Sequence, residues 1–567
     1  MNTFASRSLP RTAAIAFILL GAGHATAQTA SEVTPESFQP ALQTLSGAIV
    51  FDGTPGTQAP EGAETIGITL SGVMIVGAIS SLAEANTAFE TRLTRGRVPV
   101  SELFEATAAL EEAYANAGFV LTRVVLPQQT LRDGGVLRVE VVNGFVETVD
   151  AAAVPPAVRA RLDTLVTPLV DRPGITLPEL ERQLLLAGDV SGVALSSALA
   201  AGQRQGGTIL ALDAQFRPVT SFVGIDNFAS AALGKPTYNF GVELNSLLNQ
   251  GETFYGRFST SAENAFTDEP RYRVGALGTL FPVGTSGLTV NLEVTRSVTN
   301  PESDIADTDS SFDRESLRVA YPFIRSRQKN LSGQIAFDHQ IDRQNIRAGG
   351  DTSPIYRDEI NVVRIAANGS YRNSDAAVSE GGIMFSRGLD AFGASDGEGT
   401  PLSREGASPA FSKLTASFRH ERSLGDSFSL SVAGRGQASF GDTLVAAEQF
   451  GPVGAGDLST FDAGALRGDS GAVLRTELAY VTRTDVAGRG LAIAPYAFAG
   501  AGYVSLANPT AVEEETTNAS SFGVGVDFLL QGESPFRADS VRIEFGRGSR
   551  DNGDDEDRIS ISGNLRF

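Results

Sequence analysis

The 567-residue sequence contains no cysteine and no tryptophan, and it has only three methionines and three histidines. Without cysteine the chain has no disulfides, and the usual zinc ligand sets are not available to it. Basic residues are in deficit, because 45 Lys and Arg stand against 66 Asp and Glu, for a net charge of −21. Nucleic-acid phosphates require basic patches, so we expect no nucleic-acid partner.

Long hydrophobic runs are missing after residue 27. Arg7 and Arg11 precede an apolar run over 13–22, and Ala25-Thr26-Ala27 offers small residues to signal peptidase. This pattern predicts a signal peptide over residues 1–27. No other stretch approaches the roughly eighteen consecutive apolar residues of a membrane-spanning helix. The mature chain therefore crosses a membrane as strands or does not cross one.

Two small modules are predicted before residue 217. Residues 28–65 are rich in Thr, Pro, Gly and Ala, and we interpret them as a linker in which 37–51 could form a short helix. Residues 66–146 follow the order strand, helix, helix, strand, strand, with a helix capped by Ser101. Residues 147–216 repeat this order, with a capping box over 176–179. The tandem α+β pattern is equally typical of generic periplasmic adaptor domains.

From residue 217 to residue 567 helical periodicity stops and alternation of apolar and polar residues takes over. In the last segment Ile559, Ile561 and Leu565 share one face, whereas Arg558 and Arg566 lie on the other. A charge that faces lipid near the bilayer midplane costs about 2–4 kcal/mol, so the charged face must line an aqueous lumen. About sixteen such segments predict a transmembrane antiparallel β-barrel of about sixteen strands.

The connections between these segments are of two kinds, as in outer-membrane barrels with short periplasmic turns and long outer loops. Tight joints such as 249–251, 284–287 and 425–426 alternate with long acidic stretches. The long stretches are 300–315, 388–412, 441–471, 505–519 and 547–557. A soluble β-sandwich or propeller would not need this asymmetry.

The first module resembles the first POTRA (polypeptide-transport-associated) domain of the haemolysin-activator transporters of two-partner secretion. The resemblance is carried by residues 118–124, by Pro127-Gln128-Gln129, and by 135–137 leading to Asn143-Gly144. Residues 180–182, 191–193 and 207–208 make the second module similar to the second POTRA domain of that family. The resemblance implies an outer-membrane export pore with periplasmic docking domains and an amino-terminal plug. Candidate docking residues are Arg123, Pro127, Gln129, Gly144 and Gly192.

The resemblance also implies partners. The cargo would be a secreted partner exoprotein that docks by strand addition or in a groove between helix and sheet. The terminal Phe567 resembles the outer-membrane assembly signal, which implies the barrel-assembly machinery as a partner during biogenesis. Outer-membrane lipid and lipopolysaccharide would surround the barrel.

In the haemolysin-activator family the sixth outer loop carries Val-Arg-Gly-Phe/Tyr, and its Arg pairs with an Asp on the inner wall. By position the loop motif is Leu458-Ser459-Thr460-Phe461, which lacks the Arg. The wall strand contains Phe498 and Gly502 but has Gly500 where the Asp is expected. The absence of both the loop Arg and the wall Asp is physically reasonable, because losing only one of them would leave a charged side chain in the lumen without its partner. Arg467 could replace the lost anchor by pairing with Glu477 or Asp469, or it could be a solvated loop residue.

Three other functions fit parts of the sequence less well. A barrel-assembly factor that inserts other proteins would share the modules but typically keeps the loop Arg. A hydrolase would need a nucleophile and an acid near His339 or His420, yet the carboxylates adjacent to them in sequence point to the opposite face of the strand. A passive porin would not need two docking modules. We therefore expect no enzymatic activity.

We also expect no cofactor and no resident metal. The sequence contains no GxxxxGK[ST] phosphate loop, so no nucleotide site is indicated. The acidic stretch 551–557 could bind calcium, but a soluble hairpin tip is the simpler interpretation.

Overall fold

The computed structural model describes residues 29–38, 50–51, 59–303, 307–348, 351–374, 376–395, 397–532, 536–551 and 553–567. One compact unit extends from Gln43 to Phe216, and the other joins Arg217–Phe567 to the segment that precedes Gln43. The expected signal peptide lies outside the described residues, as do positions 39–49 of the possible helix over 37–51. Ser37 and Phe38 are not helical. None of the helices in the described part is both long and apolar enough to span a membrane.

The first module has the predicted order, and its four-stranded sheet has the strand order β3-β2-β5-β4. Its second helix buries Leu103, Ala106 and Leu110 at helical spacing, as predicted. Ser101 does not cap this helix, because the helix already begins at Val100. The elements are β2 (Gly67–Val76), η1 (Ser80–Leu82), α1 (Ala83–Leu93), β3 (Arg97–Pro99), α2 (Val100–Asn116), β4 (Arg123–Val125) and β5 (Gly135–Val142).

The second module repeats the strand, helix, helix, strand, strand order, and its sheet has the order β1-β7-β8-β6. The predicted capping box of Thr176 and Glu179 is present at the start of α4. The short strand β1 comes from the segment before the first module and pairs in parallel with β7. The elements are β1 (Val50–Phe51), β6 (Phe145–Ala153), α3 (Pro156–Val166), η2 (Thr167–Leu169), α4 (Leu177–Gly188), β7 (Val193–Ala201) and β8 (Gly207–Phe216).

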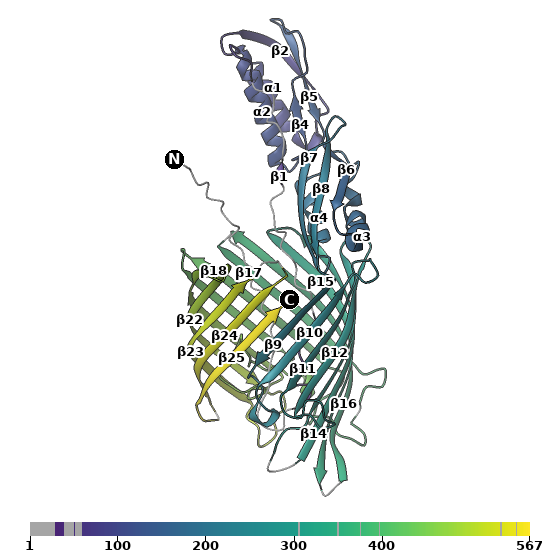
Figure 1. The fold of residues 1–567 in the computed structure, drawn as a ribbon, viewed down its shortest axis with the longest axis vertical. Coiled ribbons are helices and arrows are strands. Elements are labelled where there is room, and N and C mark those ends of the chain that lie inside the picture. The colour runs from purple at the N-terminus through teal and green to yellow at the C-terminus, as the bar shows by residue number, and fades with distance from the viewer. Residues whose placement is uncertain are drawn as a thin grey trace. The chain divides into compact units, whose positions relative to one another are not determined.

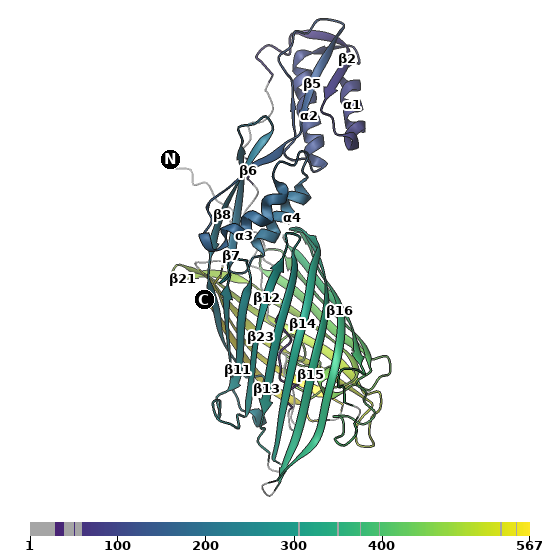
Figure 2. The same ribbon diagram turned by 90° about the vertical axis from the view of Figure 1, so that its right-hand side faces the viewer.

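The remaining strands form a closed antiparallel barrel, seen from two sides in Figures 1 and 2. Strands β20 and β21 follow each other along the same neighbour, β22, and so occupy one position. The seventeen elements β9 to β25 therefore make sixteen strand positions, which confirms the predicted fold class. The bounds of β9 to β17 are Val219–Asp226, Thr237–Asn245, Thr253–Ser261, Tyr272–Val283, Leu288–Thr299, Asp307–Arg325, Lys329–Ala348, Asp351–Ser374 and Ala377–Leu389. The bounds of β18 to β25 are Ser412–Leu424, Phe428–Ala438, Ser470–Tyr480, Thr482–Val486, Arg489–Ser505, Thr516–Gln531, Ala538–Arg550 and Glu556–Arg566.

The two faces of the barrel follow the alternation in the sequence. On β24 and β25, Phe545 and Ile559 are more than half exposed on the outside, whereas Glu544 and Ser560 are buried on the inside. The barrel closes where β25 pairs with β9, and the backbone N–H of Phe567 donates to the carbonyl of Ser221 at 2.8 Å. The apolar outer face is the one that contacts lipid in a transmembrane barrel.

One predicted loop is wrong. Residues 300–315 were expected to connect two strands, but β14 begins at Asp307 and pairs with β15 as far as Arg347. The polar composition misled the prediction, because the charged side chains pair across the strands. Arg347, for example, donates to Asp309 at 2.9 Å.

Candidate functional site inside the barrel

The loop between β19 and β20, residues 439–469, folds into the barrel, and we call it the inward loop. It is the sixth loop at its end of the barrel, after those that follow β9, β11, β13, β15 and β17. Leu458, Ser459, Thr460 and Phe461 are at most 2% exposed. Part of the loop forms an apolar core against the inner wall. The core consists of Phe450, Val453, Leu458, Phe461, Leu466, Val473, Val504 and Ala519.

Glycines on the wall make room for the loop motif. A Cβ atom added to Gly500 would lie 3.3 Å from Cδ2 of Leu458, and one added to Gly548 would lie 2.7 Å from Cζ of Phe461. The wall strand identified in the sequence therefore does face the loop motif. Side chains at these two positions would displace the loop.

The wall, and not the loop, supplies the cation at this contact. Arg475 lies on β20 directly opposite Gly500 in the ladder and is 2% exposed. Its Nη1 donates to the carbonyl of Asp457 at 3.1 Å and to Oγ of Ser459 at 2.8 Å. The structure thus replaces the expected loop Arg and wall Asp with a wall Arg and loop oxygen atoms.

Arg475 is itself held by the wall. Its guanidinium stacks on the ring of Phe498 at 3.9 Å, pairs with Glu544 at 2.5 Å, and donates to Glu477 at 2.7 Å. Glu477 also accepts from Arg542 at 3.2 Å. The anchor is therefore a connected network in which each buried charge has a partner of opposite sign. Sequence reasoning missed Arg475, although it lies two residues before Glu477 and so on the same face.

Four acidic residues of the inward loop each meet a basic residue from elsewhere in the barrel. These pairs are Glu448 with Arg364 and Lys413, Asp457 with Arg435, Asp462 with Lys235 and Arg558, and Asp469 with Arg404. Burial would raise the pKa of Glu448, but Arg364 and Lys413 outweigh that effect and lower it. The inward loop is thus held by ion pairs between its acidic side chains and basic side chains elsewhere in the barrel.

Arg467 does lie inside the barrel, but its partners differ from those expected. It forms an ion pair with Glu32 of the amino-terminal segment and donates to the carbonyl of Ala446 at 2.9 Å. Glu477 and Asp469 are already paired with Arg475 and Arg404, which explains why neither accepts Arg467. Burial raises the pKa of Glu32, and Arg467 offsets only part of this effect.

Residues 29–38, the amino-terminal segment, also lie in the lumen. The segment forms a turn over 30–33 and has no regular structure from 34 to 38. Val33 packs in a small buried cluster with Tyr272 and Val274 of β12. The ring of Phe38 contacts the guanidinium of Arg257 at 4.6 Å and the ring of Tyr255 at 4.5 Å. Loop and segment together occupy the lumen, joined by the Glu32–Arg467 pair.

The docking residues proposed from the sequence all lie in the two-module unit. Arg123 pairs with Glu111 at 2.7 Å, and Gln129, two residues beyond Pro127, donates to the carbonyl of Arg138. A Cβ atom on Gly144 would collide with the backbone of Leu121, and Gly192 has φ of +73° in a turn. Their contacts lie within the two-module unit, and their role in docking stays a prediction.

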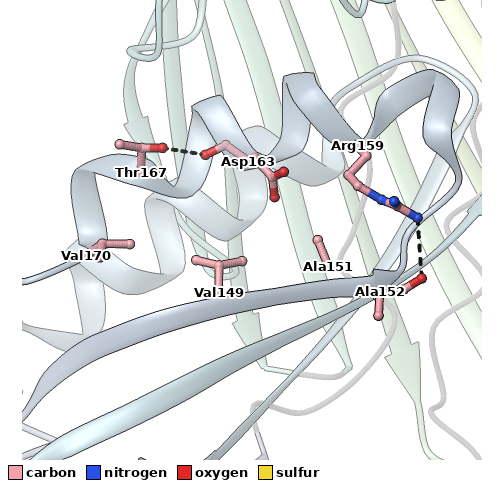
Figure 3. A pocket seen from close by; sticks show the side chains of 7 residues that line it. All are labelled: Val149, Ala151, Ala152, Arg159, Asp163, Thr167 and Val170. Carbon is pink, nitrogen blue, oxygen red and sulfur yellow. Dashed lines mark hydrogen bonds between the residues drawn. The ribbon is translucent and has the colours of Figure 1, made fainter.

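The second module instead offers a groove between α3 and the edge strand β6, shown in Figure 3. Its volume is about 430 Å³. Val149 and Ala151 form part of its floor, and Arg159 and Asp163 rise from α3. Because β6 ends the order of its sheet, its outer edge pairs with no full strand in the described part of the chain, although Val146 at its start forms a bridge with Val170. An open edge beside a helix is a site where an extended peptide can add a strand.

The two histidines contact side chains other than the carboxylates next to them in sequence. The carboxylate near His339 is that of Glu359, 4.0 Å from Nε2. His339 contacts Asn361, with Nδ1 2.9 Å from Oδ1. Nδ1 of His420 lies 2.9 Å from Oγ of Ser379, but both residues lie on the outward face of the barrel, the same face as Phe418 and Phe385. Glu421, next to His420, instead accepts from Arg419 at 2.7 Å.

The acidic hairpin tip expected near 551–557 carries its charges in pairs. Asp555 pairs with Arg547 at 2.9 Å, and Asp551 accepts from Asn518 at 2.8 Å. Within the described ranges, no group of three His, Asp or Glu side chains could hold a metal ion.

A family model for the haemolysin secretion/activation protein ShlB/FhaC/HecB matches residues 206–528, more than half of the chain. The chain belongs to this family. A model for the ShlB-type POTRA domain matches residues 78–144. The protein is therefore an outer-membrane barrel of two-partner secretion, with periplasmic POTRA domains, that exports a partner protein. No curated protein sequence matches the chain.

Solved structures share the fold at low identity. CdiB from Escherichia coli is 19% identical with a TM-score of 0.71, over 91% of this chain and 94% of CdiB. CdiB from Acinetobacter baumannii is 16% identical with a TM-score of 0.62, over 93% and 95%. BamA from Haemophilus ducreyi lacking POTRA domains 1–3 is 11% identical with a TM-score of 0.50, over 88% and 100%.

Proposed function

We propose that export requires both the inward loop and the amino-terminal segment to leave the lumen. The observation that carries this proposal is that both are held by ion pairs and hydrogen bonds, which can break without covalent chemistry. Folding of the partner outside the cell would make the transfer directional, and no enzymatic step is involved.

We also propose that the partner first docks in the groove along β6. A strand added there would use main-chain hydrogen bonds for affinity and the apolar floor for selectivity. Val149 and Ala151 supply that floor, and Arg159 and Asp163 can pair with side chains of either charge. The residues named from the sequence would then support the fold of the docking unit.

Blocking the groove should reduce export. We expect Val149→Arg to lower the secreted amount of the partner by about tenfold or more, because the long charged side chain fills the floor. The matched control is Val136→Arg, since Val136 is half-exposed on β5 away from the groove. Quantitative immunoblots of medium, normalised to folded barrel in the membrane, measure the effect. Equal loss in both variants would count against docking at β6.

The function itself is tested by comparing the secreted proteins of strains with and without this gene. Loss of one large exoprotein, with the outer-membrane profile unchanged, is the expected result. Depletion of many outer-membrane proteins would instead indicate an assembly factor. An unchanged secreted profile would contradict the export function.

For biogenesis we propose that the barrel-assembly machinery recognises Phe567 at the end of the closing strand. In the membrane, lipopolysaccharide would contact the acidic outer loops. The position of Phe567 beside β9, at the seam of the barrel, supports the first proposal.

A further inference from the structure

The wall of the barrel binds the main chain of the amino-terminal segment at several points. The N–H of Ala30 donates to Oγ of Ser310 at 3.0 Å, and the N–H of Phe38 donates to Oε2 of Glu293 at 3.1 Å. Three carbonyls of the segment accept from wall side chains. These contacts are Val33 with Tyr272 at 3.2 Å, Pro35 with Arg314 at 3.1 Å, and Phe38 with Arg318 at 2.9 Å. Main-chain groups are common to all polypeptides, so these contacts do not depend on sequence.

The five wall residues form a continuous strip, which we call the luminal track: Tyr272, Glu293, Ser310, Arg314 and Arg318. They lie on the adjacent strands β12, β13 and β14. As the segment advances from Ala30 to Phe38, its partner on β14 moves from Ser310 through Arg314 to Arg318. The segment therefore follows β14 along the barrel.

The track has a composition suited to an extended chain. Glu293 and Ser310 accept from amides, whereas Tyr272, Arg314 and Arg318 donate to carbonyls. Within the described ranges, Nε of Arg314, Nε of Arg318 and Oγ of Ser316 are buried without a hydrogen-bond partner. Buried polar groups in proteins usually have partners. The track thus has more hydrogen-bonding groups than residues 29–38 use.

We propose that the luminal track is a binding site for the main chain of an extended polypeptide, and that residues 29–38 occupy it as a substitute for the exported partner. The partner displaces the segment and takes over its contacts with β12 to β14. This proposal rests on the proposed export function for the identity of the ligand. The site itself is argued from the five contacts alone.

Peptide binding tests the site. The probes are fluorescein-labelled peptides with the sequence of residues 29–38 and with a scrambled order of the same residues, measured by fluorescence anisotropy. The receptor is the purified chain in detergent, with residues 29–38 deleted so that the track is free. We expect both peptides to bind, because the contacts with the track are to the main chain. The scrambled peptide should bind more weakly, since it loses the pairing of Glu32 with Arg467 and the packing of Val33 and Phe38.

Variants of the wall decide the site's position. Arg314→Gln with Arg318→Gln should weaken both peptides by about tenfold or more, since hydrogen bonds from charged donors are lost. The matched control, Arg419→Gln, removes a barrel Arg that pairs with Glu421 on β18 and should change binding less than about twofold. Gels of heated and unheated samples verify that each barrel is closed. Failure of either peptide to bind, or wall variants that bind either peptide normally, would overturn the proposal.

Cross-linking in exporting cells tests the ligand. A photo-reactive amino acid at Ser316, which lies on β14 between Arg314 and Arg318, should capture the protein whose secretion depends on this gene. The same group at Ile335, which is 60% exposed on the lipid side, is the control and should not capture it. Secretion that depends on the gene without an adduct at Ser316 would overturn the track and leave the export function standing. Peptide binding in detergent together with an unchanged secreted profile would support the track and contradict the export function.

Discussion

Replacing Arg475 by Ala should release the inward loop and destabilise the barrel by about 3–5 kcal/mol, the usual cost of removing one partner from a buried ion pair. The side chain is 2% exposed and contacts Asp457, Ser459, Glu477 and Glu544. Without it, Glu477 keeps Arg542, but Glu544 loses its ion-pair partner in the lumen. Export should fall strongly because the destabilised barrel leaves less folded protein in the membrane. In the barrels that do fold, conductance in planar bilayers should rise because the loop no longer fills the lumen.

The fraction of folded barrel on gels, followed as a function of sample temperature, measures this destabilisation. Arg419→Ala is the control, because it removes a barrel Arg that forms an ion pair with Glu421 of its own strand. Arg475→Lys should recover part of the stability, since Lys keeps the charge but lacks the planar fork that contacts several oxygens at once. Normal export and conductance in Arg475→Ala would show that the loop is held elsewhere.

Sequence reasoning located the inward loop but not its anchor. The family resemblance placed Phe498, Gly500 and Gly502 on the inner wall, and in the structure Gly500 faces Leu458. The search was for an anion at position 500 and a cation in the loop. The cation lies instead on the neighbouring strand, directly opposite Gly500. The register between β20 and β22, which no single strand reveals, brings them together.

The acidic excess of the loop was a usable indication. Between residues 439 and 469 the sequence has five acidic residues, namely Asp442, Glu448, Asp457, Asp462 and Asp469, and a single basic one, Arg467. A buried anionic loop requires a cationic wall. The amino-terminal segment gave no such indication, because its main-chain contacts leave no trace in its composition. The family resemblance implied an amino-terminal plug, but which wall residues hold the segment follows from the tertiary structure alone.

The polar ends of β14 to β16 show a second limit of prediction from sequence, because the beginning of β14 was expected to be a loop. Asp309 and Arg347 have the composition of a loop, yet they pair across two strands of the barrel. Periodicity predicts the central part of such strands well, because lipid imposes the alternation there. Beyond the membrane both faces contact water, so the alternation disappears although the ladder continues.

The basic residue of the anchor lies on the wall and not in the loop, and this leads to a second large effect. Ser459→Arg should be harmful alone but tolerated in combination with a substitution of Arg475. Ser459→Arg restores the family's loop Arg, but it places a second guanidinium where Ser459 already accepts from Arg475. Overpacking costs about 1–3 kcal/mol, and an additional confined charge of like sign adds to it. The single variant should therefore fold poorly and lose export.

Combining Ser459→Arg with Arg475→Ser should recover folding, because the new guanidinium can pair with Glu544 from the loop side. We expect a coupling energy of about 2 kcal/mol or more between the two positions, within the range for residues in contact. Folding on heated gels of the four proteins of the cycle measures it. Ser459→Gln controls for size, since it lengthens the side chain without adding charge and should be milder than Ser459→Arg. If the two substitutions act additively, Arg475 and the loop motif do not share one site, and the assignment of the wall cation as the loop anchor is wrong.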